Sequence, residues 1–219
     1  MKSTLTQRIV AEGLGTAFLL AAVVGSGIMA AKLSGGNAAL ALLCNTLPTG
    51  AILAVLILML GPISGAHLNP AVSIAFALRG ELRARALLPY IAAQVIGGIA
   101  GVWAAHLMFE LPVWQISATV RAGPGQWFAE AVATFGLVMT IFGCVVRTPA
   151  AVPYAVGLYI TSAYWFTAST SFANPAVTIA RSLSDTFAGI APANVAAFIA
   201  AQLAGMIAAV ALGHWIWRS

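Results

Sequence analysis

Long, uninterrupted runs of apolar residues dominate the hydrophobic pattern of this chain, and short polar stretches separate them. A membrane-spanning helix needs about 20 predominantly apolar residues, and the chain contains six runs of that size. They cover residues 8–30, 39–60, 84–107, 126–147, 151–168 and 193–216. The strands of a membrane barrel would instead appear as segments of about 10 residues with alternating hydrophobicity. The pattern therefore predicts an all-α membrane protein with six transmembrane helices.

The composition excludes most soluble classes. Of the 219 residues, 61% are hydrophobic and 7% are charged, whereas an ordinary soluble domain is about a quarter charged. The net charge of +5 is not concentrated in a basic patch with interleaved aromatic residues, so nucleic acid is not an expected partner. Cys44 and Cys144 lie within apolar runs, which favours packing roles. Because His, Cys and acidic residues form no recognisable group, we expect no catalytic residue, metal or cofactor.

Basic residues are distributed unequally between the two sides of the predicted membrane domain. Short cytoplasmic loops collect Lys and Arg. One side holds Lys2, Arg8, Arg79, Arg83, Arg85, Arg147 and Arg218, and the other holds mainly Lys32, Arg121 and Arg181. The bias predicts that both termini face the cytoplasm.

Three landmarks occur twice in the chain, in the same order. They are an acidic residue inside a span, an Asn-Pro-Ala tripeptide, and a Gln in the next long span. They stand at Glu12 and Glu130, at 69–71 and 174–176, and at Gln94 and Gln202. Because each half contains three spans, the second half must lie inverted in the bilayer. We therefore predict one channel domain over 1–219, built from repeats at about 8–107 and 126–216 that share a pathway near the membrane centre.

The two tripeptides predict short helices that enter the membrane without crossing it. They are Asn69-Pro70-Ala71 and Asn174-Pro175-Ala176. Asn is a preferred N-cap and Pro is favoured at the first helical position, so we predict half-helices over roughly 69–79 and 174–184. Their amino ends carry partial positive charge and would repel cations where they meet. Irregular backbone at this depth is tolerated where it lines a water-filled cavity, so the pattern indicates a pore.

Several polar residues near this pore have more than one interpretation. Glu12 and Glu130 lie inside spans, where acidic residues are functional candidates. They are either proton relays or acceptors of hydrogen bonds from the re-entrant loops, and their matching positions favour the second role. Gln94 and Gln202 are predicted to support the same loops. His67 lies at the predicted inner mouth, where it either gates the pore by protonation or, more commonly, bonds to loop carbonyls.

The paired Asn-Pro-Ala boxes, the duplicated Glu and Gln positions and the six spans resemble the aquaporin family, also called the major intrinsic proteins, over residues 8–216. The resemblance implies a homotetramer with one pore in each subunit, through which small uncharged solutes pass. It also implies a selectivity filter of four positions on the outer side of the membrane centre. One of these directly follows the second Asn-Pro-Ala and is normally Arg. Here it is Val177.

Family spacing also places Thr49 and Ser171 at this filter. The fourth position remains open between Ser162 and Tyr164. Arg is permanently charged and has five donors, whereas the Val177 side chain is shorter and has none. We therefore expect a wider and less cationic neck, which suits uncharged polyhydroxy molecules.

Arg181 complicates this expectation, because it follows Val177 by four residues and lies on the same helical face. It would form a cationic ring about 6 Å further out if it pointed into the pore. The interpretation that we favour is that it extends to the outer interface or pairs with Asp185.

The replacement of this Arg by Val is similar to a bacterial branch of the family that is linked to arsenic-resistance operons, the AqpS type. That likeness implies a bacterial plasma (inner) membrane protein that passes metalloid hydroxides such as arsenite and methylated arsenicals, beside glycerol-like polyols and water. The residues alone predict a wide channel for uncharged solutes. The alternatives are a secondary transporter coupled to protons, since these also use inverted repeats and broken helices, a small-anion channel, and a membrane protein with a closed pore.

Overall fold

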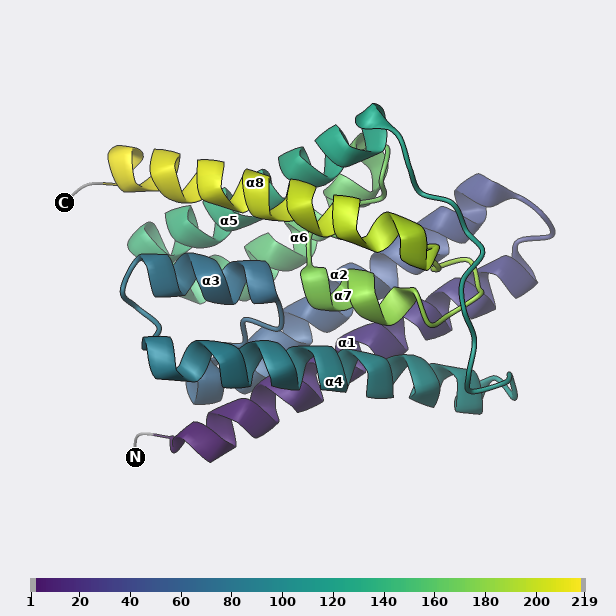
Figure 1. Ribbon diagram of the computed structural model, residues 1–219, viewed down its shortest axis with the longest axis horizontal. Helices are drawn as coiled ribbons and strands as arrows, with labels where there is room; N and C mark the ends of the chain where they lie inside the picture. The colour runs from purple at the N-terminus through teal and green to yellow at the C-terminus, as the bar shows by residue number, and fades with distance from the viewer. Residues whose placement is uncertain (1–2, 218–219) are drawn as a thin grey trace.

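The computed structural model describes residues 3–217, so the charges at Lys2 and Arg218 lie outside the described residues. These residues form helices and no strand (Figure 1), which confirms the predicted all-α fold. The helices are α1 (Leu5–Leu33), α2 (Ala38–Ser64), α3 (Pro70–Leu78), α4 (Ala84–Met108), α5 (Pro124–Arg147), the 3-10 helix η1 (Pro149–Ala151), α6 (Val152–Phe166), α7 (Pro175–Arg181) and α8 (Pro192–Ile216).

Six of these helices coincide with the six predicted spans. Five of them, α1, α2, α4, α5 and α8, are long and apolar enough to cross a membrane. The sixth, α6, has 15 residues and therefore extends about 22 Å at about 1.5 Å per residue. The 3-10 turn η1 precedes it directly and lengthens this segment at one end.

The two halves of the chain pack in the same way. In the first half α1 packs against α4 and α2, and in the second half α5 packs against α8 and α6. Figure 1 shows α3 and α7 between these long helices, entering from opposite ends of the bundle and meeting near its centre. The first and last described segments lie at the same end of the bundle. Large apolar side chains such as Leu88 and Leu158 are exposed on its outside, as expected for a surface that faces lipid.

Close backbone contact at the helix crossings depends on glycine. A Cβ atom at Gly97 in α4 would collide with the carbonyl oxygen of Gly13 in α1. In the second half, a Cβ atom at Gly205 in α8 would collide with the carbonyl oxygen of Ala131 in α5. Small residues at such crossings allow membrane helices to approach closely. The same device thus brings together the equivalent helix pair in each half.

The two half-helices begin where the Asn-Pro pairs predict. The Asn69 Oδ1 atom accepts a hydrogen bond from the Ala71 backbone N–H (2.9 Å), and the Asn174 Oδ1 atom accepts one from the Ala176 N–H (3.0 Å). The following Pro has no N–H that would be left unpaired. The second half-helix, α7, ends at Arg181, earlier than the predicted end at 184.

Candidate functional site

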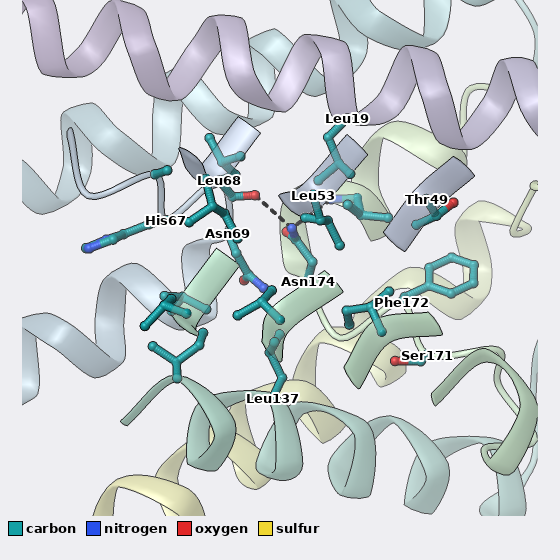
Figure 2. A pocket seen from close by; sticks show the side chains of 18 of the residues that line it. Leu19, Thr49, Leu53, His67, Leu68, Asn69, Leu137, Ser171, Phe172 and Asn174 are labelled. Carbon is teal, nitrogen blue, oxygen red and sulfur yellow. Dashed lines mark hydrogen bonds between the residues drawn. The ribbon is translucent and has the colours of Figure 1, made fainter. Parts of the chain in front are cut away.

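The two Asn-Pro-Ala boxes hold each other at the centre of the bundle. The Asn69 Nδ2 atom donates to the Ala173 carbonyl (2.8 Å), and the Asn174 Nδ2 atom donates to the Leu68 carbonyl (2.8 Å; dashed line in Figure 2). Each amide group has two hydrogens, and these bonds use one of each. Both Asn side chains line a cavity, so the second hydrogen of each is available to a solute there.

The loops that lead into the two half-helices adopt the same unusual backbone conformation. Leu68 (φ 50°) and Ala173 (φ 48°), which directly precede the two Asn residues, are left-handed. Ala66 (φ 47°) and Ser171 (φ 49°), two residues earlier, are left-handed as well. Side chains other than Gly rarely adopt this conformation, and it persists only where surrounding contacts impose it. These loops therefore need strong anchors.

Glu12 anchors the first loop. Its carboxylate is fully buried and accepts hydrogen bonds from the Ser64 hydroxyl (2.6 Å) and the Gln94 side-chain amide (2.8 Å). It also accepts from the backbone N–H groups of His67 (2.9 Å) and Leu68 (2.7 Å). The carboxylate thus fixes the loop immediately before the first Asn-Pro-Ala box.

Glu130 anchors the second loop in the same manner. Its buried carboxylate accepts from the backbone N–H groups of Phe172 (2.8 Å) and Ala173 (2.9 Å) and from the Gln202 amide (2.6 Å). Gln202 also donates to the Thr178 hydroxyl (2.8 Å), which ties it to α7. These bonds are the contacts that the loop-support interpretation of the duplicated Glu and Gln residues requires.

A cavity of about 120 Å³ lies at the junction of the half-helices. Apolar residues of α1, α2, α5 and α6 form a large part of its wall. Its polar side chains are Thr49, His67, Asn69, Tyr164, Ser171, Asn174 and Arg181. The carboxylates of Glu12 and Glu130 lie behind this wall and do not line it.

Four of the proposed filter residues meet at one part of the cavity wall. Thr49, Tyr164, Ser171 and Val177 all line it, and 3.5 Å separates the hydroxyl oxygens of Tyr164 and Thr49. We call these four residues the constriction. Ser162, the other candidate for the fourth position, is exposed on the outside of α6 and donates to the Tyr159 carbonyl (2.8 Å). The structure therefore places Tyr164 at the cavity and excludes Ser162 from it.

Contrary to the expectation from its sequence position, Arg181 faces the cavity and does not extend to the outer interface. Its side chain is 2% exposed and lines the cavity, with its Nε atom donating to the Ala188 carbonyl. The guanidinium carbon lies 3.4 Å from the centre of the Phe172 ring. No ion pair in the described part of the chain joins Arg181 to Asp185, which instead accepts from the Ala118 N–H (2.9 Å). The prediction that Arg181 extends to the interface or pairs with Asp185 is wrong, and the cavity wall carries a positive charge.

Arg121 is a second cation here that the sequence analysis missed. It comes from the segment between α4 and α5, donates from Nε to the Gly189 carbonyl (2.8 Å) and lies 5.0 Å from the centre of the Phe172 ring. Burial lowers its pKa, but a guanidinium titrates so far above neutral pH that it stays charged. Its carbonyl partner lies 68 residues away in sequence, so no local pattern could have placed it here.

His67 lines the other part of the cavity (Figure 2). Its Nδ1 atom lies 3.1 Å from the Ser73 hydroxyl, and its ring stacks on Phe76 with 4.6 Å between the ring centres. The ring is thus held against α3, on the opposite side of the junction from the constriction.

This arrangement of two facing half-helices inside a bundle of long apolar helices defines a class of membrane channel. The chain matches the family model described as Major intrinsic protein over residues 1–151, and it belongs to this family, the aquaporins. It is therefore a multi-pass membrane protein and a passive channel for small solutes, and not an enzyme.

Individual relatives agree with this assignment. The chain is 58% identical over 212 residues to "Aquaglyceroporin AqpS" of Rhizobium meliloti (strain 1021), which covers 97% of this chain and 91% of that protein. It is 39% identical over 109 residues to "Glycerol uptake facilitator protein" of Streptococcus pneumoniae (strain ATCC BAA-255 / R6), which covers 44% of this chain and 47% of the relative. The X-ray structure of the aquaglyceroporin from Plasmodium falciparum superposes with a TM-score of 0.72 at 19% identity over 95% of both chains, and supports the fold.

Proposed function

We propose that this channel conducts small uncharged solutes larger than water as well as water itself. The solutes are metalloid hydroxides such as arsenite and methylated arsenicals, and glycerol-like polyols. The observation that carries this proposal is Val177, 5% exposed, at the cavity wall in the position where the family normally has Arg. Its neighbours Thr49 and Ser171 are also small. The similarity to a protein named aquaglyceroporin supports the polyols, and the resemblance to the arsenic-operon branch supports the metalloids.

The polar groups of the cavity suit an uncharged solute that carries hydroxyl groups. Three hydroxyls of the constriction and two Asn amides replace part of the hydration that such a solute loses, while the apolar wall keeps binding weak. Permeation needs binding that is favourable enough to enter and weak enough to leave. A small cation is opposed by the positive amino ends of α3 and α7 and by the cost of leaving water.

The assembly and orientation are part of the same proposal. The protein forms a homotetramer with a pore in each subunit, in a bacterial plasma membrane, with both termini in the cytoplasm. Each subunit is one channel domain with inverted repeats over about 8–107 and 126–216. The equivalent packing of α1 with α4 and α5 with α8 supports the repeats.

The alternatives differ in what they require of the cavity. A proton-coupled transporter needs a titratable group on the pathway, and the buried contacts of Glu12 and Glu130 favour a supporting role instead. A small-anion channel is the second candidate, because Arg181 brings a positive charge to the cavity wall. Single-channel currents in a planar bilayer under a chloride gradient would identify it.

The test of the proposed function is Val177→Arg in proteoliposomes, with stopped-flow measurement of arsenite, glycerol and water permeability. We expect glycerol and arsenite flux to fall at least about tenfold, the factor that 1.4 kcal/mol of barrier represents, while water flux falls much less. The isosteric Val177→Thr variant serves as the control and should keep all three fluxes near those of the wild type. Equal losses for water and the larger solutes in Val177→Arg would refute the proposal.

A further inference from the structure

Arg181 occupies a place in the cavity wall that the proposed function does not explain. The residue after the second Asn-Pro-Ala box has no charge, yet a guanidinium one helical turn further along α7 is buried and lines the same cavity. We propose that Arg181 determines charge selectivity in this channel, while Val177 determines how large a solute can pass. Selection by charge and selection by size then depend on different residues. This inference rests on the proposed channel function.

Helix geometry places Val177 and Arg181 at different depths along the pore. Residues four apart in a helix lie on the same face and about 6 Å apart along the axis. Val177 and Arg181 both line the cavity, as this spacing requires. A solute therefore meets the guanidinium and the narrow neck at different depths, and the short Val177 side chain leaves the neck open.

The contacts of Arg181 hold its charge without neutralising it. Its Nε atom donates to the Ala188 carbonyl, and its guanidinium lies over the Phe172 ring. A buried charge is costly unless polar groups or water solvate it. Because Arg181 lines the cavity, water that fills this cavity would solvate the terminal nitrogens of the guanidinium.

Arg121 strengthens the positive potential at the same level. It lies against Phe172, as Arg181 does, at 5.0 Å from the ring centre. The two guanidiniums are bonded to consecutive carbonyls, those of Ala188 and Gly189. A Cβ atom at Gly189 would collide with the Ser184 carbonyl and the Ser117 hydroxyl, so this turn is tightly packed. Two like charges are thus fixed beside the neck by backbone contacts that leave little freedom to move.

The expected effect follows from Coulomb's law. A unit charge about 6 Å from a passing cation slows its passage by a factor between about 3, at the dielectric constant of water, and about 100, at an effective dielectric constant near 20; about tenfold is the middle of this range. An uncharged solute experiences no such barrier. Removing the charge at Arg181 should therefore raise cation passage relative to the passage of neutral solutes.

The experiment compares wild-type protein with Arg181→Gln in liposomes and planar bilayers. Potassium conductance under a KCl gradient reports charge selectivity, and stopped-flow water and glycerol permeability reports an open pore. We expect the ratio of potassium conductance to water permeability to rise about tenfold. Potassium conductance at the wild-type level in a variant that still conducts water would overturn the inference.

Two further variants keep the test decisive. Arg181→Met retains an apolar stem on Phe172 and replaces Arg181→Gln if the latter does not conduct water. If both neutral variants assemble but lose water flux, Arg181 is a structural residue and the inference is wrong. The double variant Val177→Arg with Arg181→Gln returns a guanidinium to the neck, so it should exclude potassium again and reduce glycerol flux. Failure of wild-type glycerol or arsenite flux would count against the proposed function alone, because potassium and water are measured separately.

Discussion

Glu130→Gln tests whether the buried carboxylates support the loops or carry protons. The Glu130 side chain is fully buried and accepts hydrogen bonds from Phe172 N, Ala173 N and Gln202 Nε2 at 2.8, 2.9 and 2.6 Å. The amide of the variant keeps one acceptor oxygen and turns an NH₂ group toward these donors. At least one backbone N–H therefore loses its partner, and the others lose a charged one.

The size of the effect follows from these three bonds. A buried donor left without a partner costs about 1–3 kcal/mol, and a hydrogen bond to a charged group contributes about 1.5–3 kcal/mol. The amide of Gln202 can rotate and offer its Oε1 atom, which has no partner among the described residues, and this offsets part of the loss. We expect the free energy of unfolding to fall by about 3–5 kcal/mol. The melting temperature in detergent should then fall by about 6–20 °C, at about 2–4 °C per kcal/mol for a chain of this size.

The assay combines thermal unfolding in detergent with stopped-flow water permeability. Water flux should fall with stability, because the same loop positions Asn174. Thr134→Val is the matched control: Thr134 lies one turn along α5, and its buried hydroxyl has no partner in the described structure, so its removal should be neutral. A Glu130→Gln protein with wild-type melting temperature and water flux would refute the supporting role. If that stable variant lost a pH-dependent component of solute flux, the result would instead indicate that Glu130 is a proton relay.

Two further predictions concern packing. Gly205→Val should prevent assembly of the folded protein, because its side chain would meet the Ala131 carbonyl; yield of monodisperse protein in detergent measures this. Gly61→Ala, at an open position of α2, should be neutral or stabilising by up to about 1 kcal/mol, and an equal loss in both variants would refute the close-crossing argument. Phe172→Ala removes the ring that both guanidiniums approach and should lower the melting temperature through the loss of about 3–5 kcal/mol; an unchanged melting temperature would contradict the packing described.

Local sequence signals predicted most of the fold. The spans follow from the length of apolar runs, and the half-helices follow from Asn and Pro acting at their own helix ends. These signals depend only on residues that are close together in the sequence, so they can be interpreted without the three-dimensional structure. The duplicated order of Glu, Asn-Pro-Ala and Gln added the inverted arrangement, because an odd number of spans reverses the second half.

The side-chain positions near the constriction could not be predicted in the same way. Spacing in the sequence left Ser162 and Tyr164 as alternatives for the fourth filter position. They lie on different faces of the short helix α6, and only Tyr164 faces the cavity. Arg181 points inward because the Ala188 carbonyl and Phe172 receive it, and Arg121 joins them from a distant segment. These contacts depend on how the loops fold over the helix bundle. The sequence contains no periodic pattern that would predict this loop folding.

The hydrogen bonds between the two Asn-Pro-Ala boxes affect how the protein folds while it is being synthesised. When residues up to Met108 have been made, Asn69 has its own helix to cap, but its partner carbonyl at Ala173 has yet to be translated. The amino-terminal half must therefore wait, with its central amide unpaired, until more than 60 further residues have been inserted. Each Asn side chain therefore completes its hydrogen bonds only when the other half of the chain is in place.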